Sequence, residues 1–216
     1  MKKMFVVVAV LLAMFAGQAQ AQAPALAQVN NSAQASTPAK AATWEFDPTH
    51  SMVGFGVRHM MVSTVRGSFP KFSGSLQIAG DDPTVAVFQV VIDVTSIDTR
   101  DAKRDEHLKS AEFFDAAKFP TMTFKSRKVV KAGEGRLKIT GDLTLKGVSK
   151  EVVLDVEGPS AAVKDPWGMV RIGAQATAKI NRQDFGLTWS KALETGGVVV
   201  GDEVTITLDI ELVRKQ

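Results

Sequence analysis

Apolar and polar residues alternate along most of the chain beyond Thr43. In the C-terminal segment every second residue is apolar, and the residues between are polar or charged. The apolar set is Val204, Ile206, Leu208, Ile210 and Leu212, and the polar set is Thr205, Thr207, Asp209 and Glu211. A period of two is the period of a β-strand, so this strand is predicted to have one buried face and one solvent-exposed face.

The same alternation recurs at residues 137–145 and 170–180, and in shorter runs at 53–57, 72–78, 122–124 and 152–156. Residues 85–94 differ because they are apolar on both faces, which makes this strand the predicted place for a covering helix. Short turns rich in Gly, Asp and Pro separate the runs, for example at residues 80–83 and 165–168. Gaps this short imply antiparallel neighbours.

The pattern predicts an all-β fold. Eight or nine strands are expected, and several are about ten residues long, which corresponds to roughly 33 Å of extended chain. Long strands with a single apolar side are best satisfied by a closed barrel whose inward faces meet. A sandwich of two sheets is the alternative.

One segment, residues 98–124, has helical periodicity. His107, Leu108, Ala111 and Phe114 fall on one side of a 3.6-residue helix, which predicts a short helical insert near residues 100–115. Phe113 and Phe114 at the end of this stripe suggest an aromatic plug beside a break in the barrel wall. A helix that simply covers a sheet face explains the stripe equally well.

The N-terminus has the features of an export signal. Lys2 and Lys3 precede an uncharged run from Met4 to Ala16, and small residues follow at Ala19 and Ala21. The run is too short to span a bilayer as a helix. Residues 1–21 are therefore predicted to be a signal peptide that is removed, with no membrane-spanning segment remaining.

Residues 22–42 are almost wholly Ala, Gln, Pro, Ser, Asn and Thr. Such a segment cannot bury enough apolar surface to order itself, so a disordered low-complexity linker is predicted. The folded domain is then expected to cover residues 43–216, a length that suits one domain.

The excess of basic residues lies outside the predicted domain. The chain has 26 Lys and Arg against 23 Asp and Glu, and Lys2, Lys3 and Lys40 account for the difference. A neutral domain without a basic stripe gives no support for a nucleic-acid partner. The chain has no cysteine, which excludes a disulfide framework, a thiolate zinc site and a cysteine nucleophile.

Few residues suggest catalysis. The three histidines, His50, His59 and His107, have spacings that match no short metal-ligand motif, so no metal is expected. Asp47, His50 and Ser51 are too close along the chain to converge easily as a nucleophilic relay. A hydrogen-bonded turn between two strands is the preferred interpretation of this segment. The sequence therefore predicts no catalytic residues.

A series of motifs resembles a known family. They are DPTHS at 47–51, VRGSF at 65–69, FSG at 72–74, RDEHL at 104–108, FF at 113–114, GDLT at 141–144, KGV at 146–148 and RQDFG at 182–186. This series resembles the YceI family of exported, lipocalin-like proteins that bind polyisoprenoids. The resemblance covers essentially all of residues 43–216. It implies an eight-stranded antiparallel lipocalin-like barrel with a helical insert near one end, and it transfers no catalytic constellation.

If the barrel holds a lipid chain, apolar inward residues would form its wall. The candidate ligand-binding residues are Phe55, Val57, Phe72, Phe88, Phe113, Phe114, Phe124, Leu143, Ala174, Ala176, Ala178 and Trp189. The three alanines interrupt a bulky apolar face, so they either leave space for a ligand or permit close packing. His59 and His107 are candidates for the ligand's head group, although satisfied structural histidines are the alternative.

The sequence thus predicts a periplasmic or secreted protein, not an enzyme, that binds, stores or transports an isoprenoid-type lipid and needs no further cofactor. A barrel filled by its own side chains, acting as a stress-related interaction protein, is one alternative. A hydrolase is another, but it would need a compact polar triad. The sequence does not identify the lipid, and it leaves open whether two barrels pair as a homodimer.

Overall fold

The computed structural model describes residues 41–80, 82–194 and 196–215. The predicted signal peptide and residues 22–40 of the predicted linker lie outside the described residues. Strand β1 begins at Ala41, and Ala42 packs against a buried cluster that contains Trp44. Ala41 and Ala42, at the end of the predicted linker, thus lie in β1, and the predicted domain bounds stay a prediction.

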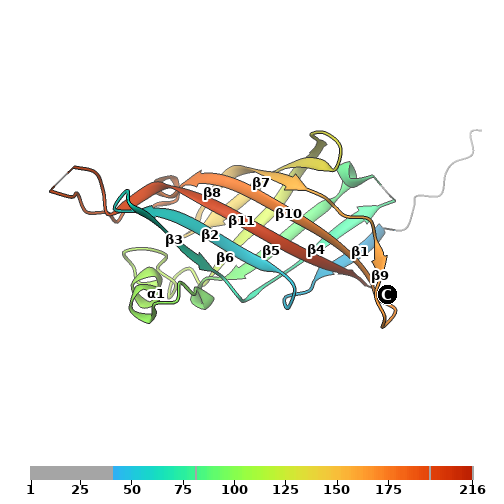
Figure 1. Ribbon diagram of the computed structural model, residues 1–216, viewed down its shortest axis with the longest axis horizontal. Helices are drawn as coiled ribbons and strands as arrows, with labels where there is room; N and C mark the ends of the chain where they lie inside the picture. The colour runs from blue at the N-terminus through green and yellow to red at the C-terminus, as the bar shows by residue number, and fades with distance from the viewer. Residues whose placement is uncertain (1–40, 81, 195, 216) are drawn as a thin grey trace, which may run out of the picture. The chain divides into compact units, whose positions relative to one another are not determined.

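Strands account for most of the described chain (Figure 1). They are β1 (Ala41–Phe46), β2 (Met52–His59), β3 (Ser63–Ser68), β4 (Phe72–Ala79), β5 (Val87–Asp93), β6 (Thr121–Lys131), β7 (Arg136–Leu145), β8 (Val148–Glu157), β9 (Val163–Lys164), β10 (Val170–Asn181) and β11 (Val200–Arg214). The helical elements are α1 (Ala102–Lys109) and the 3₁₀ turns η1 (Pro83–Val85), η2 (Val94–Ser96) and η3 (Arg182–Phe185).

The strands close into one ring. β11 pairs with β10 on one side, and on the other side it pairs with β2 and then with β1. We use the word stave for one strand position in the barrel wall. β3 pairs with β2 and β4 pairs with β1, so β1 and β2 together form one interrupted stave, and β3 and β4 together form the next. From β4 the ring continues through β5, β6, β7 and β8 to β10. Within the described chain this makes eight antiparallel staves, which confirms the predicted barrel over the sandwich.

The alternation read from the sequence is the inward and outward alternation of the staves. On β8, Val152, Leu154 and Val156 are buried while the residues between them are exposed. The prediction for residues 85–94 was wrong, however. Val87 and Val91 point outward and are each 44% exposed, so nothing in the described chain covers this face.

Three phenylalanine rings on the inner surface lie against glycines of the neighbouring strand. A Cβ atom built on Gly67 would lie 2.5 Å from Cζ of Phe55, and one on Gly74 would lie 2.6 Å from Cε2 of Phe46. A Cβ on Gly141 would lie 2.5 Å from Cζ of Phe124. Such pairs let a large ring lie flat on the wall because the glycine leaves room for it.

Helix α1 is shorter than predicted. Asp101 caps its start by accepting hydrogen bonds from the backbone N–H groups of Lys103 and Arg104, and it ends before Ser110. Ala111 and Phe114 therefore lie in the turns that follow, not on a helical stripe. None of the residues of α1 is fully buried, so it is not a helix that covers a sheet face.

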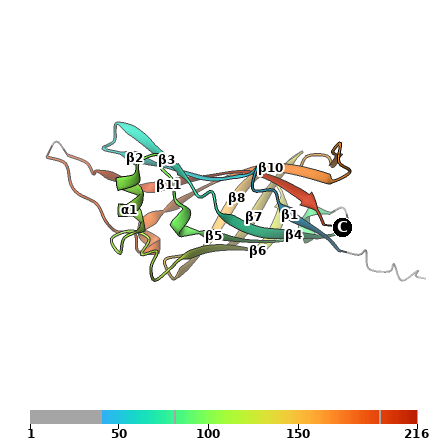
Figure 2. The ribbon, with the colours of Figure 1, turned by 90° about the horizontal axis from the view of Figure 1, so that it is seen from below.

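The segment that carries α1 closes one end of the barrel. This segment follows β5 in the chain. Among the described residues, it pairs with β3 through one isolated antiparallel β-bridge, between Ser68 and Asp98. Val94, Ile97 and Ala116 from this segment are buried in the main core. Both views place α1 at the end where the β2–β3 hairpin lies (Figure 1, Figure 2). No helix among the described residues is long and apolar enough to cross a membrane.

We predict that Gly141→Ala destabilises the barrel by about 1–3 kcal/mol, because the added methyl must displace Phe124 or the carbonyl oxygen of Lys125, also 2.5 Å away. The matched control is Gly173→Ala on β10, where the nearest heavy atom to the new Cβ is 3.7 Å away. The control should be neutral or slightly stabilising. Denaturant unfolding of both variants checks this, and equal losses would contradict the proposed role of the glycine.

Candidate ligand site in the barrel interior

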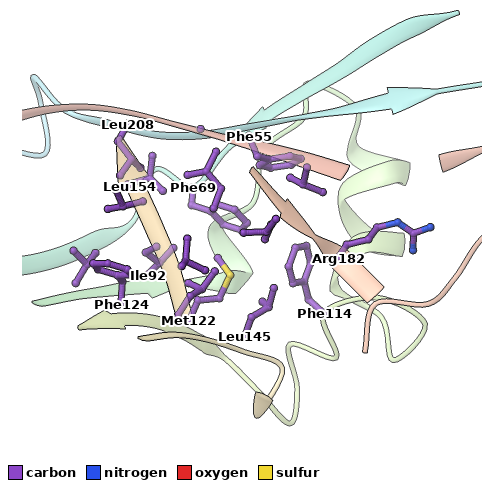
Figure 3. A pocket seen from close by; sticks show the side chains of 18 of the residues that line it. Phe55, Phe69, Ile92, Phe114, Met122, Phe124, Leu145, Leu154, Arg182 and Leu208 are labelled. Atoms are coloured by element: carbon purple, nitrogen blue, oxygen red, sulfur yellow. The ribbon is translucent and has the colours of Figure 1, made fainter. Parts of the chain in front are cut away.

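The barrel encloses a cavity of about 160 Å³ near the end that carries α1. Its wall is built by inward residues of β2, β5, β6, β7, β8 and β11, and its end is closed by Leu108, Phe113 and Phe114 from the insert (Figure 3). None of the described residues presents a polar atom to this space. The cavity can therefore accept a hydrocarbon but offers no hydrogen bond to it.

A second cavity, of about 80 Å³, lies in the barrel interior on the side away from α1. It too is lined without exposed polar atoms among the described residues. Its wall includes Leu76 and Ile78 of β4, Leu137 and Ile139 of β7, and Ala174 of β10. The interior is therefore not completely filled by side chains.

The sequence-predicted residues fall into three groups. Those that line the first cavity are Phe55, Val57, Phe88, Phe113, Phe114, Phe124 and Leu143. Those that line the second are Ala174, Ala176 and again Phe88. Phe72, Ala178, Trp189, His59 and His107 line neither cavity. Phe72 packs edge-on against Phe46, with ring centroids 5.9 Å apart, and Ala178 is buried in the barrel wall.

The wall also contains residues that the sequence analysis did not select. They include Met122, Leu145, Ile180, Arg182, Leu187, Val204 and Ile206. The strand residues among them share the inward alternation and could have been found from it. Arg182 and Leu187 lie around η3, outside the alternating runs, and the RQDFG motif was the only signal for them.

Arg182 closes the cavity with its aliphatic stem while its charge faces away from it (Figure 3). The residue is only 3% exposed. Its Nη1 donates to the carbonyl oxygens of Leu187 and, at 2.9 Å, Trp189. Its Nε donates to Gly201 at 2.9 Å, and Nη2 reaches the Val200 carbonyl at 3.3 Å and Oδ1 of Asp202 at 2.9 Å.

These bonds occupy the guanidinium on all sides, so Arg182 stabilises the fold and leaves no donor for a ligand. The buried charge is compensated by one carboxylate and four carbonyl dipoles, as burial of an ion requires.

An aromatic cluster links the insert to the segment after η3. His107 packs edge-on against Phe113 and Trp189, with ring centroids 5.0 Å and 5.2 Å apart, and Phe113 lies 5.2 Å from Trp189. Nε2 of His107 lies 2.5 Å from Oε2 of Glu112. His107 is thus engaged by its neighbours. His59 lies at the end of β2, paired with Ser63 and Val200.

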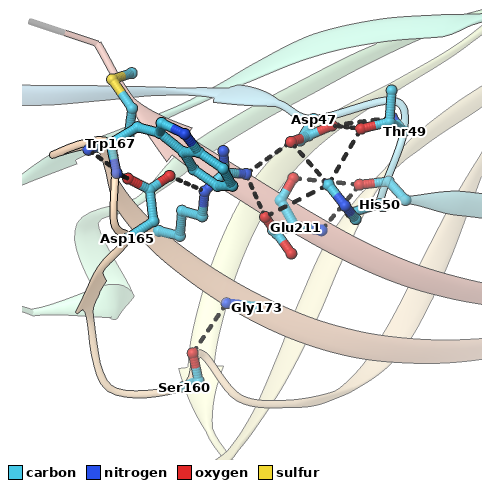
Figure 4. A network of polar contacts seen from close by, with 11 residues as sticks. Asp47, Thr49, His50, Ser160, Asp165, Trp167, Gly173 and Glu211 are labelled. Atoms are coloured by element: carbon cyan, nitrogen blue, oxygen red, sulfur yellow. Dashed lines mark hydrogen bonds and ion pairs between the residues drawn. The ribbon is translucent and has the colours of Figure 1, made fainter.

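The Asp47–Ser51 segment forms the turn that the sequence predicted (Figure 4). Oδ1 of Asp47 accepts from the backbone N–H of Thr49 at 2.9 Å. The hydroxyl of Ser51 donates to the carbonyl oxygen of Glu211 and accepts from its N–H at 2.9 Å. Because Ser51 is bonded to Glu211 and not to His50, the three residues do not form a nucleophilic relay.

Arg171 is the centre of an ion cluster on the outer surface, and Figure 4 shows its three partners, Asp47, Asp165 and Glu211. Its Nη1 lies 2.7 Å from Oδ2 of Asp47 and 2.5 Å from Oε1 of Glu211, and its Nε lies 2.7 Å from Oδ2 of Asp165. The bond from Arg171 lowers the pKa of Asp165. Hydrogen bonds from Thr49, from His50 and then from Arg171 lower the pKa of Asp47 far below its usual range.

Ligand atoms of Asp47, His50 and Glu211 lie within 4.8 Å of one another, close enough for a metal ion. Nη1 of Arg171 already pairs with both carboxylates, so a divalent ion would have to displace a guanidinium that bridges them. The two carboxylates among the three candidate ligands are therefore already paired with Arg171, and this cluster does not support a resident metal.

The fold and the cavities together define a closed antiparallel barrel with an apolar interior. The family model for the YceI-like domain matches residues 44–212, and the chain belongs to this family. A UPF0312 protein of Vibrio cholerae is 41% identical over 140 residues, which cover 64% of this chain and 72% of the relative. This confirms the family suggested by the sequence motifs.

Two solved structures show the same architecture. The YceI protein of Campylobacter jejuni is 32% identical, with a TM-score of 0.62 over 74% of this chain and 90% of that one. A polyisoprenoid-binding domain from Saccharophagus degradans is 18% identical, with a TM-score of 0.57 over 80% of this chain and 98% of that one. The second likeness concerns the fold alone.

Arg182→Met should destabilise the protein by about 3 kcal/mol or more, since several carbonyl oxygens would lose their donor and each buried orphan costs about 1–3 kcal/mol. Arg136→Met is the control, because Arg136 forms an exposed ion pair with Glu157. Such pairs contribute only about 0–1 kcal/mol. The midpoint of denaturant unfolding measures both, and a loss at position 182 no larger than at 136 would contradict the structural role of Arg182.

The ion cluster predicts a pH dependence of stability. Since folding lowers the pKa of Asp47, its stabilisation is complete above the unfolded pKa of about 4 and is lost as the pH falls below it. Asp47→Asn should therefore lower the melting temperature most at neutral pH, and the difference from the native protein should narrow in acid. Asp209→Asn, an exposed carboxylate on β11, is the control. A difference that does not change with pH would exclude the electrostatic explanation.

Proposed function

We propose that this protein binds a long-chain isoprenoid or similar lipid inside its barrel and carries or stores it without chemical turnover. The observation that carries the proposal is the enclosed interior, in which two cavities are lined without exposed polar atoms among the described residues. A site of this kind selects for hydrocarbon because any buried polar group of a ligand would lose its hydrogen bonds to water. The name of the Saccharophagus domain, which has the same fold, supports this class of ligand.

The polar head of such a lipid would remain outside the cavities. Arg182, the one charged residue in the described wall, is fully bonded to backbone and to Asp202. His107 packs edge-on against two aromatic rings and is bonded to Glu112. The tail would therefore provide most of the binding energy, at about 0.8 kcal/mol for each buried CH₂ group.

A role in the periplasm or outside the cell is part of the proposal. It rests on the signal-peptide pattern of residues 1–21 and on the neutral, cysteine-free domain. Intact-mass measurement of the exported protein tests it, because a mature chain that retains residues 4–16 would be incompatible with cleavage.

Native mass spectrometry of freshly purified protein tests lipid binding directly, together with two variants at neighbouring positions. Val152 is buried and lines the first cavity, whereas Val153 points outward and is exposed. Val152→Phe should fill part of the cavity and reduce bound lipid roughly tenfold or more, the loss expected for displacing two or more buried CH₂ groups. Val153→Phe should retain it.

Both variants would also be melted thermally, so that a loss of lipid is distinguished from a loss of fold. Native protein that carries no extractable lipid and takes up none would refute the proposal and favour a side-chain-filled barrel.

A further inference from the structure

The two cavities are neighbours in the barrel interior. Four side chains line both of them, Phe88 from β5, Leu154 from β8, and Leu208 and Ile210 from β11. We call these four residues the waist. The waist lies between the space on the α1 side and the space that Ala174 and Ala176 line.

Phe88 differs from the other rings near the waist. Phe46 and Phe124 lie against Gly74 and Gly141, which hold them flat on the wall. No glycine of the described chain lies against the ring of Phe88 in this way. Its cross-strand partner on β4 is Leu76, and its ring packs edge-on against Phe46 at 5.5 Å and Phe124 at 6.1 Å.

Phe88 also has room to move. It is only partly buried although it points inward, because empty space lies on both sides of it. Close packing is what normally holds a core side chain in one rotamer. The space on both sides of Phe88 lets its ring turn toward either cavity, whereas the ring of Phe124 is buried.

The second cavity extends the site along the barrel. Ile180 lines the first cavity and Ala174 lines the second, and the six steps along β10 from one to the other correspond to about 20 Å. On this face bulky Ile172 and Ile180 flank the alanines, and across the strands Ala176 faces Leu208 and Val156. The small side chains thus leave space in the second cavity, directly across the strands from Leu208 and Ile210 of the waist.

We propose that Phe88 is an internal gate between two halves of one lipid site, so that the barrel prefers chains long enough to pass the waist and end beside Ala174 and Ala176. This inference rests on the proposed function. It adds that selectivity is for the length of the chain, and that Phe88 and Ala176 determine it. Short chains occupy the first cavity alone and do not require Phe88 to turn.

The test uses geraniol, farnesol and geranylgeraniol, a series of prenyl alcohols of increasing length, with native mass spectrometry to measure occupancy and loading rate. Ala176→Phe should weaken geranylgeraniol roughly tenfold or more, because at least two CH₂ groups lose their place, and should leave geraniol unchanged. Thr177→Phe is the control, since Thr177 is the adjacent, outward and exposed residue. Phe88→Ala should raise the loading rate of geranylgeraniol several-fold and that of geraniol by clearly less, and Val87→Ala on the outer face of β5 is its control.

The outcomes separate the two proposals. If native protein binds none of the three alcohols, the proposed function fails. If it binds them but Ala176→Phe weakens all three equally, the second cavity does not hold the far end of the chain. If Phe88→Ala changes no loading rate, Phe88 is not a gate. Thermal melts accompany each variant, and Ala176→Leu and Phe88→Leu replace any that unfolds and are judged by the same comparisons.

Discussion

The closure of eight staves into one ring is the constraint on which the rest of the structure depends. In a closed barrel of eight strands, the interior is narrow and largely shielded from water. Each inward side chain must therefore be apolar or must form hydrogen bonds with other protein groups. Most staves meet this condition by simple alternation. Arg182 meets it differently, because its stem faces the cavity while its guanidinium is bonded to the backbone of Leu187, Trp189 and Gly201. A charged residue can therefore form part of the cavity wall beside Leu108, Phe113 and Phe114.

The breaks in the first two staves would weaken the wall if nothing joined them to their neighbours. At the β1–β2 break, the N–H of Asp47 donates to the carbonyl of Glu211, and Ser51 exchanges two hydrogen bonds with the same residue. Arg171 of β10 then forms ion pairs with Asp47 and Glu211, which connects this break to β10. At the β3–β4 break, the bridge from Ser68 to Asp98 attaches the insert that carries α1. Polar groups on the outside thus hold together a wall whose inside is apolar.

The sequence predicted what depends on local periodicity. The strands, their closure into a barrel and the turn at Asp47 follow from alternation and turn chemistry. The family and the number of eight strands follow from the motifs. The helical stripe through Ala111 and Phe114 failed because the chain leaves the helix at Ser110, and Phe114 reaches the cavity from a turn. Arg171 and Asp47 are 124 residues apart, so their pairing depends on a register that one sequence does not reveal. The same holds for Phe72 and Phe88, which look equivalent along the chain although only Phe88 lines the cavities.

This last distinction bears on how an apolar barrel can be selective at all. Hydrogen bonds usually give binding sites their specificity, and a wall without exposed polar atoms cannot use them. What remains is the shape of the space inside the barrel. Gly74 and Gly141 leave room for the rings of Phe46 and Phe124, since a Cβ atom at either position would lie 2.6 Å or less from the ring. Under the proposed function, these glycines would influence, through the rings beside them, which chain fits, without contacting the ligand themselves.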